Sequence, residues 1–192
     1  MATDARRGRT RARGVSDGLT PKQSRIRAAA LELSREAGLN VQDYGDLSGQ
    51  QLTTFLEVAL RELVRAHVTT AFAWSDEALG TIVAQYFFGK RSPIALWKTA
   101  RYRRFNHYIL ENLGFRAKLN LVRDLGKLRT TTFRQLDHLN TVRNGLAHTF
   151  FPENLRSARP MWRNASLFTV EGMRAFTADM AIVRADLYRH YP

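Results

Sequence analysis

The sequence predicts an all-α protein, an irregular bundle of about five to seven helices. Apolar residues recur at spacings of three and four along several segments, which is the period of a helix with one buried face. Almost every boundary between these segments carries residues that begin or end helices. No segment shows sustained alternation of apolar and polar residues, so we expect no β-sheet.

The first predicted helix begins at Thr20-Pro21, because a capping residue there precedes a first-turn proline, and Gln23 stands at capping-box spacing. Gly38 is its expected end. The pair Ser48 and Gln51 repeats the capping spacing before a longer helix. The broad apolar face of that helix comprises Leu52, Phe55, Leu56, Ala59, Leu60, Leu63, Val64, Val68 and Phe72.

A third, shorter helix is expected from Ser75 to Gly89, with acidic residues at its N-terminus. Further helices are predicted from Ser92 to Leu113, over residues 116–125, and from Thr131 to Phe150. Residues 152–167 contain two prolines and are expected to form a loop that exposes Arg156, Arg159 and Arg163. The last helix begins near Thr169 and buries one narrow seam, formed by Met173, Phe176, Met180, Val183 and Leu187.

The length of 192 residues and the hydrophobic content of 44% suit one buried core. We therefore expect residues 1–19 to be a disordered, arginine-rich tail and residues 20–192 to form a single helical domain. The chain has no cysteine, which excludes disulfides, thiolate zinc sites and a cysteine nucleophile. It also lacks an apolar run of membrane-spanning length and a secretory signal, so we expect a cytoplasmic protein without a membrane partner.

The net charge of +13 favours a polyanionic partner, most simply nucleic acid, although a solubilising surface would give the same charge. In the tail, Arg9, Arg11 and Arg13 could form an arm that grasps RNA, or belong to a flexible segment without a partner. A second basic segment, residues 101–108, mixes arginines with aromatic residues that could stack on bases. Alternatively, it is a helix with one solvated face. The candidate RNA contacts outside the tail are Arg101, Arg103, Arg104, Arg116 and Lys118.

One short motif carries candidate chemistry near the end of the sixth predicted helix, with Arg143, Asn144 and His148 as its polar residues. At roughly 100° per residue, Asn144 and His148 share a face, whereas Arg143 lies about 140° from His148. One copy therefore does not easily close Arg143 and His148 on one phosphate, but two copies facing each other across a dimer axis could. The same residues could simply be charges that complement the C-terminal end of a helix. Gly145, inside the motif, suggests a close approach to the backbone.

The motif Arg143-Asn144-x-x-x-His148 resembles the hallmark of the HEPN superfamily, which is an arginine, four to six residues, and then a histidine. The helix that ends with this motif follows the segment from Phe115 to Val122 in the sequence. The resemblance implies a helical bundle, a homodimer with a composite site, and a metal-independent ribonuclease without a cofactor. Such a protein would be a toxin or an antiphage effector, with a nucleotidyltransferase-like antitoxin as a cognate partner. The alternative is a non-catalytic regulator, similar to the mannitol-operon repressor, that binds protein or nucleic acid.

Metal-independent cleavage uses the 2′-OH of RNA as the nucleophile, so DNA would not be a substrate. Histidine ionises near neutral pH, so His148 can serve one proton transfer. Arg143 can hold the phosphate oxygens with two hydrogen bonds, and Asn144 can orient the phosphate or the imidazole. The expected products are a 2′,3′-cyclic phosphate and a 5′-hydroxyl. No ligand spacing in the sequence points to a metal site, and the remaining histidines, His67, His107, His138 and His190, are expected to be structural or solvated.

Overall fold

The computed structural model describes residues 20–36, 49–89, 91–149 and 160–190. These residues form seven α-helices, one short π-helix and one two-stranded sheet, so the all-α prediction is confirmed. They fall into two compact units, one before and one after the boundary between Glu57 and Val58. The predicted tail at residues 1–19, Gly38, Ser48 and the segment with Arg156 and Arg159 lie outside the described residues. The division into a tail and a single domain stays a prediction.

The first unit contains α1 (Pro21–Glu36) and the beginning of α2 (Gly49–Phe88). The predicted capping box at the start of α1 is present. The backbone N–H of Thr20 donates to Oε1 of Gln23 over 2.8 Å, and the N–H of Gln23 donates to Oγ1 of Thr20 over 3.3 Å. These reciprocal bonds satisfy donors that a helix start leaves without partners, which explains why α1 begins where the sequence predicts.

The second unit contains the rest of α2 and all later elements. The prediction of a helix start at Ser75 is wrong, because α2 continues unbroken through this position. Oγ of Ser75 donates to the carbonyl oxygen of Ala71 over 2.7 Å, so its hydroxyl is satisfied inside the helix rather than at a cap.

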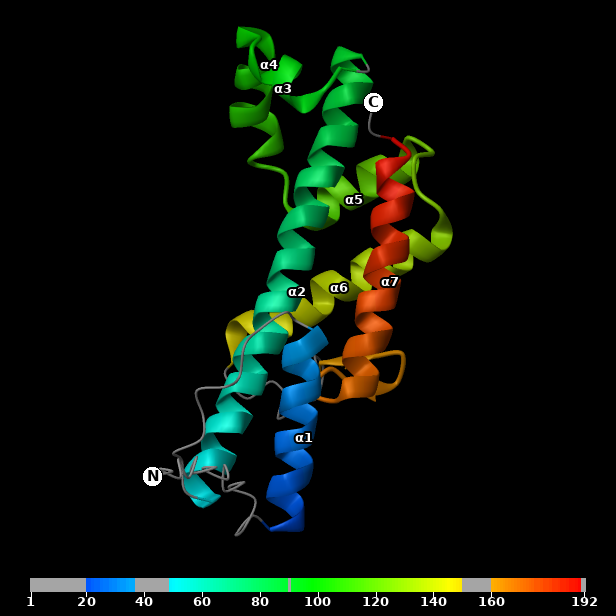
Figure 1. Cartoon of the computed structure of the whole chain (residues 1–192). Helices are drawn as coiled ribbons and strands as arrows, with labels where there is room; N and C mark the ends of the chain where they lie inside the picture. Colours follow the sequence, from blue (N-terminus) through cyan, green and yellow to red (C-terminus); the bar gives the residue numbers. More distant parts are fainter. Residues whose placement is uncertain (1–19, 37–48, 90, 150–159, 191–192) are drawn as a thin grey trace, which may run out of the picture. The chain divides into compact units, whose positions relative to one another are not determined.

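The predicted helix from Ser92 to Leu113 is divided into three elements: α3 (Pro93–Trp97), α4 (Ala100–Phe105) and the π-helix η2 (Asn106–Leu110). The division occurs at Thr99, whose Oγ1 accepts from the N–H of Tyr102 and so begins a new helix. The aromatic rings of Phe88 and Tyr102 lie 5.8 Å apart, which holds α4 beside the C-terminal end of α2 (Figure 1).

The remaining helices follow the prediction closely: α5 spans Phe115–Asp124, α6 spans Thr130–His148, and α7 spans Val170–Tyr188. The predicted seam of α7 is buried in full. The core of this unit is formed by fully buried side chains of α2, α5, α6 and α7, namely Val64, Val68, Leu79, Val83, Leu119, Val122, Leu136, Leu139, Val183 and Leu187.

One departure from the all-helical expectation is a small antiparallel hairpin before α7, made of β1 (Met161–Trp162) and β2 (Ala165–Ser166). Its turn places Arg163 and Asn164 at positive φ angles of 45° and 69°, the left-handed region that suits a two-residue hairpin turn. The guanidinium of Arg163 is exposed, as predicted, but it also donates to both carboxylate oxygens of Asp179 on α7. Buried Asp179 also accepts a hydrogen bond of 2.8 Å from Nε1 of Trp162. The carboxylate of Asp179 therefore connects the hairpin to α7 through both Trp162 and Arg163.

Candidate functional site

The three motif residues lie in the last turns of α6, where the side chains of Arg143 and His148 have different surroundings. Arg143 is half-buried; its Nη1 donates to Oδ1 of Asn144 over 3.0 Å, and its Cζ lies 4.6 Å from the ring centroid of Phe72 on α2. His148 is exposed and makes no hydrogen bond or ion pair with another described residue. Gly145, between them, is buried.

Arg143 lines a pocket of about 660 Å³ in the second unit, whereas His148 is not among the lining residues. This separation agrees with the angle of about 140° that helical geometry sets between the two positions. One chain therefore does not bring Arg143 and His148 together on one ligand atom.

The C-terminal carbonyls of α6 are occupied by a residue that the sequence did not single out. The guanidinium of Arg65 on α2 donates through Nη1 to the carbonyl oxygen of Leu146 and through Nη2 to that of Thr149. A helix end leaves such carbonyls without intrahelical partners and carries a partial negative charge, which a cation stabilises. Arg65 thus performs the role that sequence reasoning allowed as the alternative for Arg143 and His148.

The pocket beside Arg143 is lined by both charged and aromatic side chains. Within it, Nζ of Lys118 forms an ion pair of 2.8 Å with Oδ2 of Asp76, and the Lys118 side chain is only 10% exposed. Arg143 forms no ion pair with a described residue. The pocket that it lines also contains the carboxylates of Asp76, Glu77 and Glu111. The other polar or aromatic lining residues are Phe72, Glu77, Trp97, Tyr102, Asn106, Glu111, Phe115 and Asn140.

The predicted RNA contacts are distributed over several elements. Arg101, Arg103 and Arg104 are exposed on α4, and Arg116 is exposed on α5, with its Nε 3.5 Å from Oδ1 of Asp137. Lys118 is buried and paired, so its placement favours a structural role over a surface contact with phosphate. The tail residues Arg9, Arg11 and Arg13 lie outside the described residues.

The other histidines have structural surroundings or lie at the surface. Burial lowers the pKa of His67, and burial together with nearby Lys127 lowers the pKa of His190. Nε2 of His138 lies 2.8 Å from the carbonyl oxygen of Met161, a distance at which the ring N–H donates to β1. Exposed His107 lies 3.2 Å from Oε2 of Glu111.

Among the described residues, no group of three or more histidine, aspartate or glutamate side chains is arranged to hold a metal ion. None of the described helices, α2 included, combines the length and the apolar character of a membrane span. Comparisons with family models, with curated proteins and with solved structures find no match to this chain.

Proposed function

We propose that this chain is a metal-independent endoribonuclease of the HEPN type that acts as a homodimer on RNA in the cytoplasm. One observation carries the proposal: Arg65 caps the C-terminal end of α6, while His148 at this end has no described partner. Neither His148 nor pocket-lining Arg143 is needed as a helix-end charge. An uncommitted imidazole and a permanent cation on one helix suit cleavage of a phosphodiester.

The reaction would begin with removal of the proton from the 2′-OH by a histidine, after which O2′ attacks the adjacent phosphorus. Arg143 would stabilise the additional negative charge on the phosphate oxygens. The bond from phosphorus to O5′ then breaks, and O5′ takes up a proton. The products are a 2′,3′-cyclic phosphate and a 5′-hydroxyl.

A two-fold dimer supports this chemistry better than one chain, because the reaction needs two proton transfers and each motif supplies one histidine. An isologous contact through α6 would place two copies of His148 and two of Arg143 around one cleft. Destruction of cellular RNA suits a toxin or an antiphage effector, and a nucleotidyltransferase-like antitoxin is the partner that the resemblance implies.

A second candidate function is a non-catalytic regulator that binds nucleic acid. It is favoured by the different surroundings of Arg143 and His148 within one chain. The exposed arginines of α4, by contrast, need no second copy to contact phosphate.

The test is cleavage of a short RNA in excess EDTA by the wild type, Arg143→Ala, Arg143→Lys and His148→Ala. We expect each substitution to slow cleavage by about 10² to 10⁴, because each removes a group that acts in the transition state. Arg143→Lys keeps the charge but loses the two-pronged geometry. Exposed Arg134, on the same helix, gives the matched control Arg134→Ala, which should cleave like the wild type.

The RNA product should end in a cyclic phosphate, and the same oligonucleotide made with 2′-deoxyribose should remain intact. Undiminished cleavage by folded Arg143→Ala and His148→Ala would refute the proposal. RNA binding by the wild type without any cleavage would instead support the regulator.

A further inference from the structure

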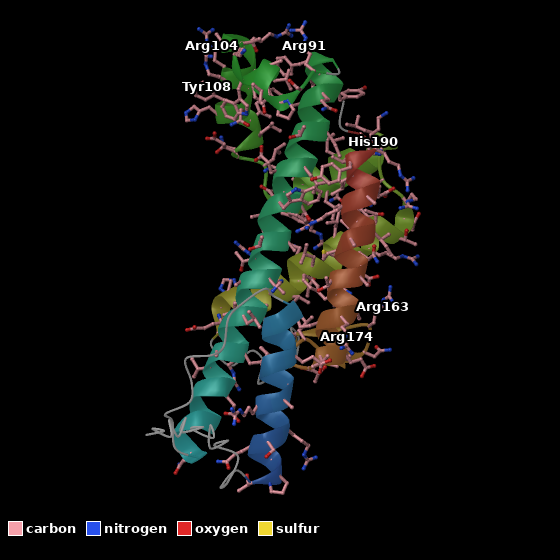
Figure 2. The ribbon with its side chains drawn as sticks, in the orientation of Figure 1. Arg91, Arg104, Tyr108, Arg163, Arg174 and His190 are labelled. Atoms are coloured by element: carbon pink, nitrogen blue, oxygen red, sulfur yellow. The ribbon has the colours of Figure 1, made fainter. Side chains whose placement is uncertain are left out.

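The elements at the C-terminal end of α2 form a strongly basic surface. Residues 91–110 contain α3, α4 and η2, and no carboxylate side chain occurs among them. Their five cationic residues are Arg91, Lys98, Arg101, Arg103 and Arg104. Figure 2 shows Arg91, Arg104 and Tyr108 projecting at this end of the second unit. Such a concentration of positive charge attracts a polyanion.

Large hydrophobic side chains are exposed on the same elements and on the adjoining C-terminal end of α2. The side chain of Tyr108 is 70% exposed and that of Phe87 is 54% exposed, and Trp97 and Ile109 are also accessible. Isolated exposed apolar residues are common in proteins, but a group of them together indicates a binding surface.

Some of these arginine and hydrophobic side chains line one pocket of about 370 Å³, a volume within the usual range of ligand sites. The rings of Phe87 and Phe105 lie 5.6 Å apart, and those of Phe88 and Phe105 lie 5.1 Å apart. Cζ of Arg101 lies 5.3 Å from the ring centroid of Phe88. We call this pocket and its rim the arginine–aromatic surface; its lining residues are Phe87, Phe88, Arg101, Arg104, Phe105, Tyr108 and Ile109.

We propose that the arginine–aromatic surface binds single-stranded nucleic acid, with an unpaired base against the aromatic side chains and the adjoining phosphates at Arg101 and Arg104. Aromatic rings stack on every base, and guanidinium groups bind phosphate through paired hydrogen bonds. The base of a duplex is stacked and paired, so it does not reach such a pocket. The positive charge beside the rings selects a polyanion rather than an apolar partner.

This binding is separable from the proposed cleavage, because a 2′-O-methyl oligonucleotide has no nucleophilic 2′-OH and can be bound without being cut. The experiment measures the affinity of the full chain for a fluorescent 2′-O-methyl oligonucleotide, for a duplex of the same length, and for vesicles that contain phosphatidylserine. The variants are Tyr108→Ala, Tyr108→Phe and Arg104→Ala. Exposed Tyr188 and Arg174 on α7 supply the matched controls Tyr188→Ala and Arg174→Ala.

We expect the single strand to bind more tightly than the duplex. Tyr108→Ala should weaken binding about fivefold or more, because one base–aromatic stack is lost, and Tyr108→Phe should bind like the wild type. Arg104→Ala should make the slope of log affinity against log salt less negative by about 0.7, the value for one phosphate contact on a single strand. Circular dichroism checks that each variant is folded.

Equal or tighter binding of the duplex would overturn the inference, as would unchanged affinity in Tyr108→Ala. Binding to vesicles in place of the oligonucleotide would identify a membrane surface and would also overturn it. Tight binding of the oligonucleotide by a protein that does not cleave RNA would uphold this inference while refuting the proposed function.

Discussion

Arg65 on α2 donates to the carbonyl oxygen of Thr149, so a residue distant in sequence caps the helix that carries the motif. Arg65→Ala should reduce the free energy of unfolding by about 1 to 2 kcal/mol, because a charged donor is lost from a partly buried helix end. It should also slow RNA cleavage, since the last turn of α6 positions His148. Urea denaturation and the cleavage assay measure the two effects.

Arg134→Ala is the control for this prediction, because Arg134 is exposed on the same helix. It should change stability by no more than about 0.5 kcal/mol. If Arg65→Ala is as stable and as active as Arg134→Ala, the cap does not support the site.

A composite site in the dimer predicts complementation between two inactive variants. Mixing Arg143→Ala with His148→Ala should restore only part of the cleavage activity. A mixed dimer keeps one Arg143 and one His148, so water has to serve one of the two proton transfers. Free exchange of subunits places about half of the dimers in the mixed form. Native mass spectrometry of chains with different tags verifies the exchange. Verified mixed dimers without activity would exclude a site in which Arg143 of one chain and His148 of the other are sufficient for cleavage.

The first turn of α7 fits closely against the hairpin, and this predicts opposite effects at two glycines. A Cβ atom on Gly172 would lie 2.0 Å from the carbonyl oxygen of Ser166, which real structures do not allow. Gly172→Ala should therefore be destabilising by more than about 1 kcal/mol, in spite of the better helix propensity of alanine.

Gly80 in α2 is the matched position, because a Cβ there would meet no described atom within 4 Å. Gly80→Ala should be neutral or stabilising by up to about 1 kcal/mol. Urea denaturation of both variants measures the difference. If Gly172→Ala is as stable as Gly80→Ala, the hairpin can move away from the added Cβ without a loss of stability, and the prediction is wrong.

Burial lowers the pKa of His67 and of His190 below the ordinary value near 6.5, so folding favours the neutral imidazole at both positions. Above the unfolded-state pKa both states are neutral, and the stabilising contribution is complete. As the pH falls through this value, the unfolded chain binds protons first and stability is lost.

The thermal unfolding midpoint should therefore decrease between about pH 7.5 and pH 5.5. His67→Gln should remove part of this decrease, and a second substitution, His190→Gln, should remove more. Exposed His107, with its carboxylate neighbour Glu111, supplies the control His107→Gln. If the double variant keeps the full pH dependence of the wild type, as the control His107→Gln should, then His67 and His190 do not cause the decrease.

The sequence by itself determined the helical class, the start of α1 and the buried seam of α7. Helical periodicity and capping depend on residues three or four apart, so a short window of sequence contains the necessary information. The angle between Arg143 and His148 follows from the same periodicity. The structure accordingly keeps them apart within one chain, as the sequence predicts.

Only the tertiary structure decided which side chains are committed to partners far along the chain. The ion pair of Lys118 with Asp76 and the cap that Arg65 forms on α6 join residues separated by 42 and more than 80 positions. Ser75 looked like a helix start because local capping rules do not show that α2 is buried against α5, α6 and α7. Long-range pairings depend on how the helices are packed, and that packing determines which cations stabilise the fold and which remain available to a ligand.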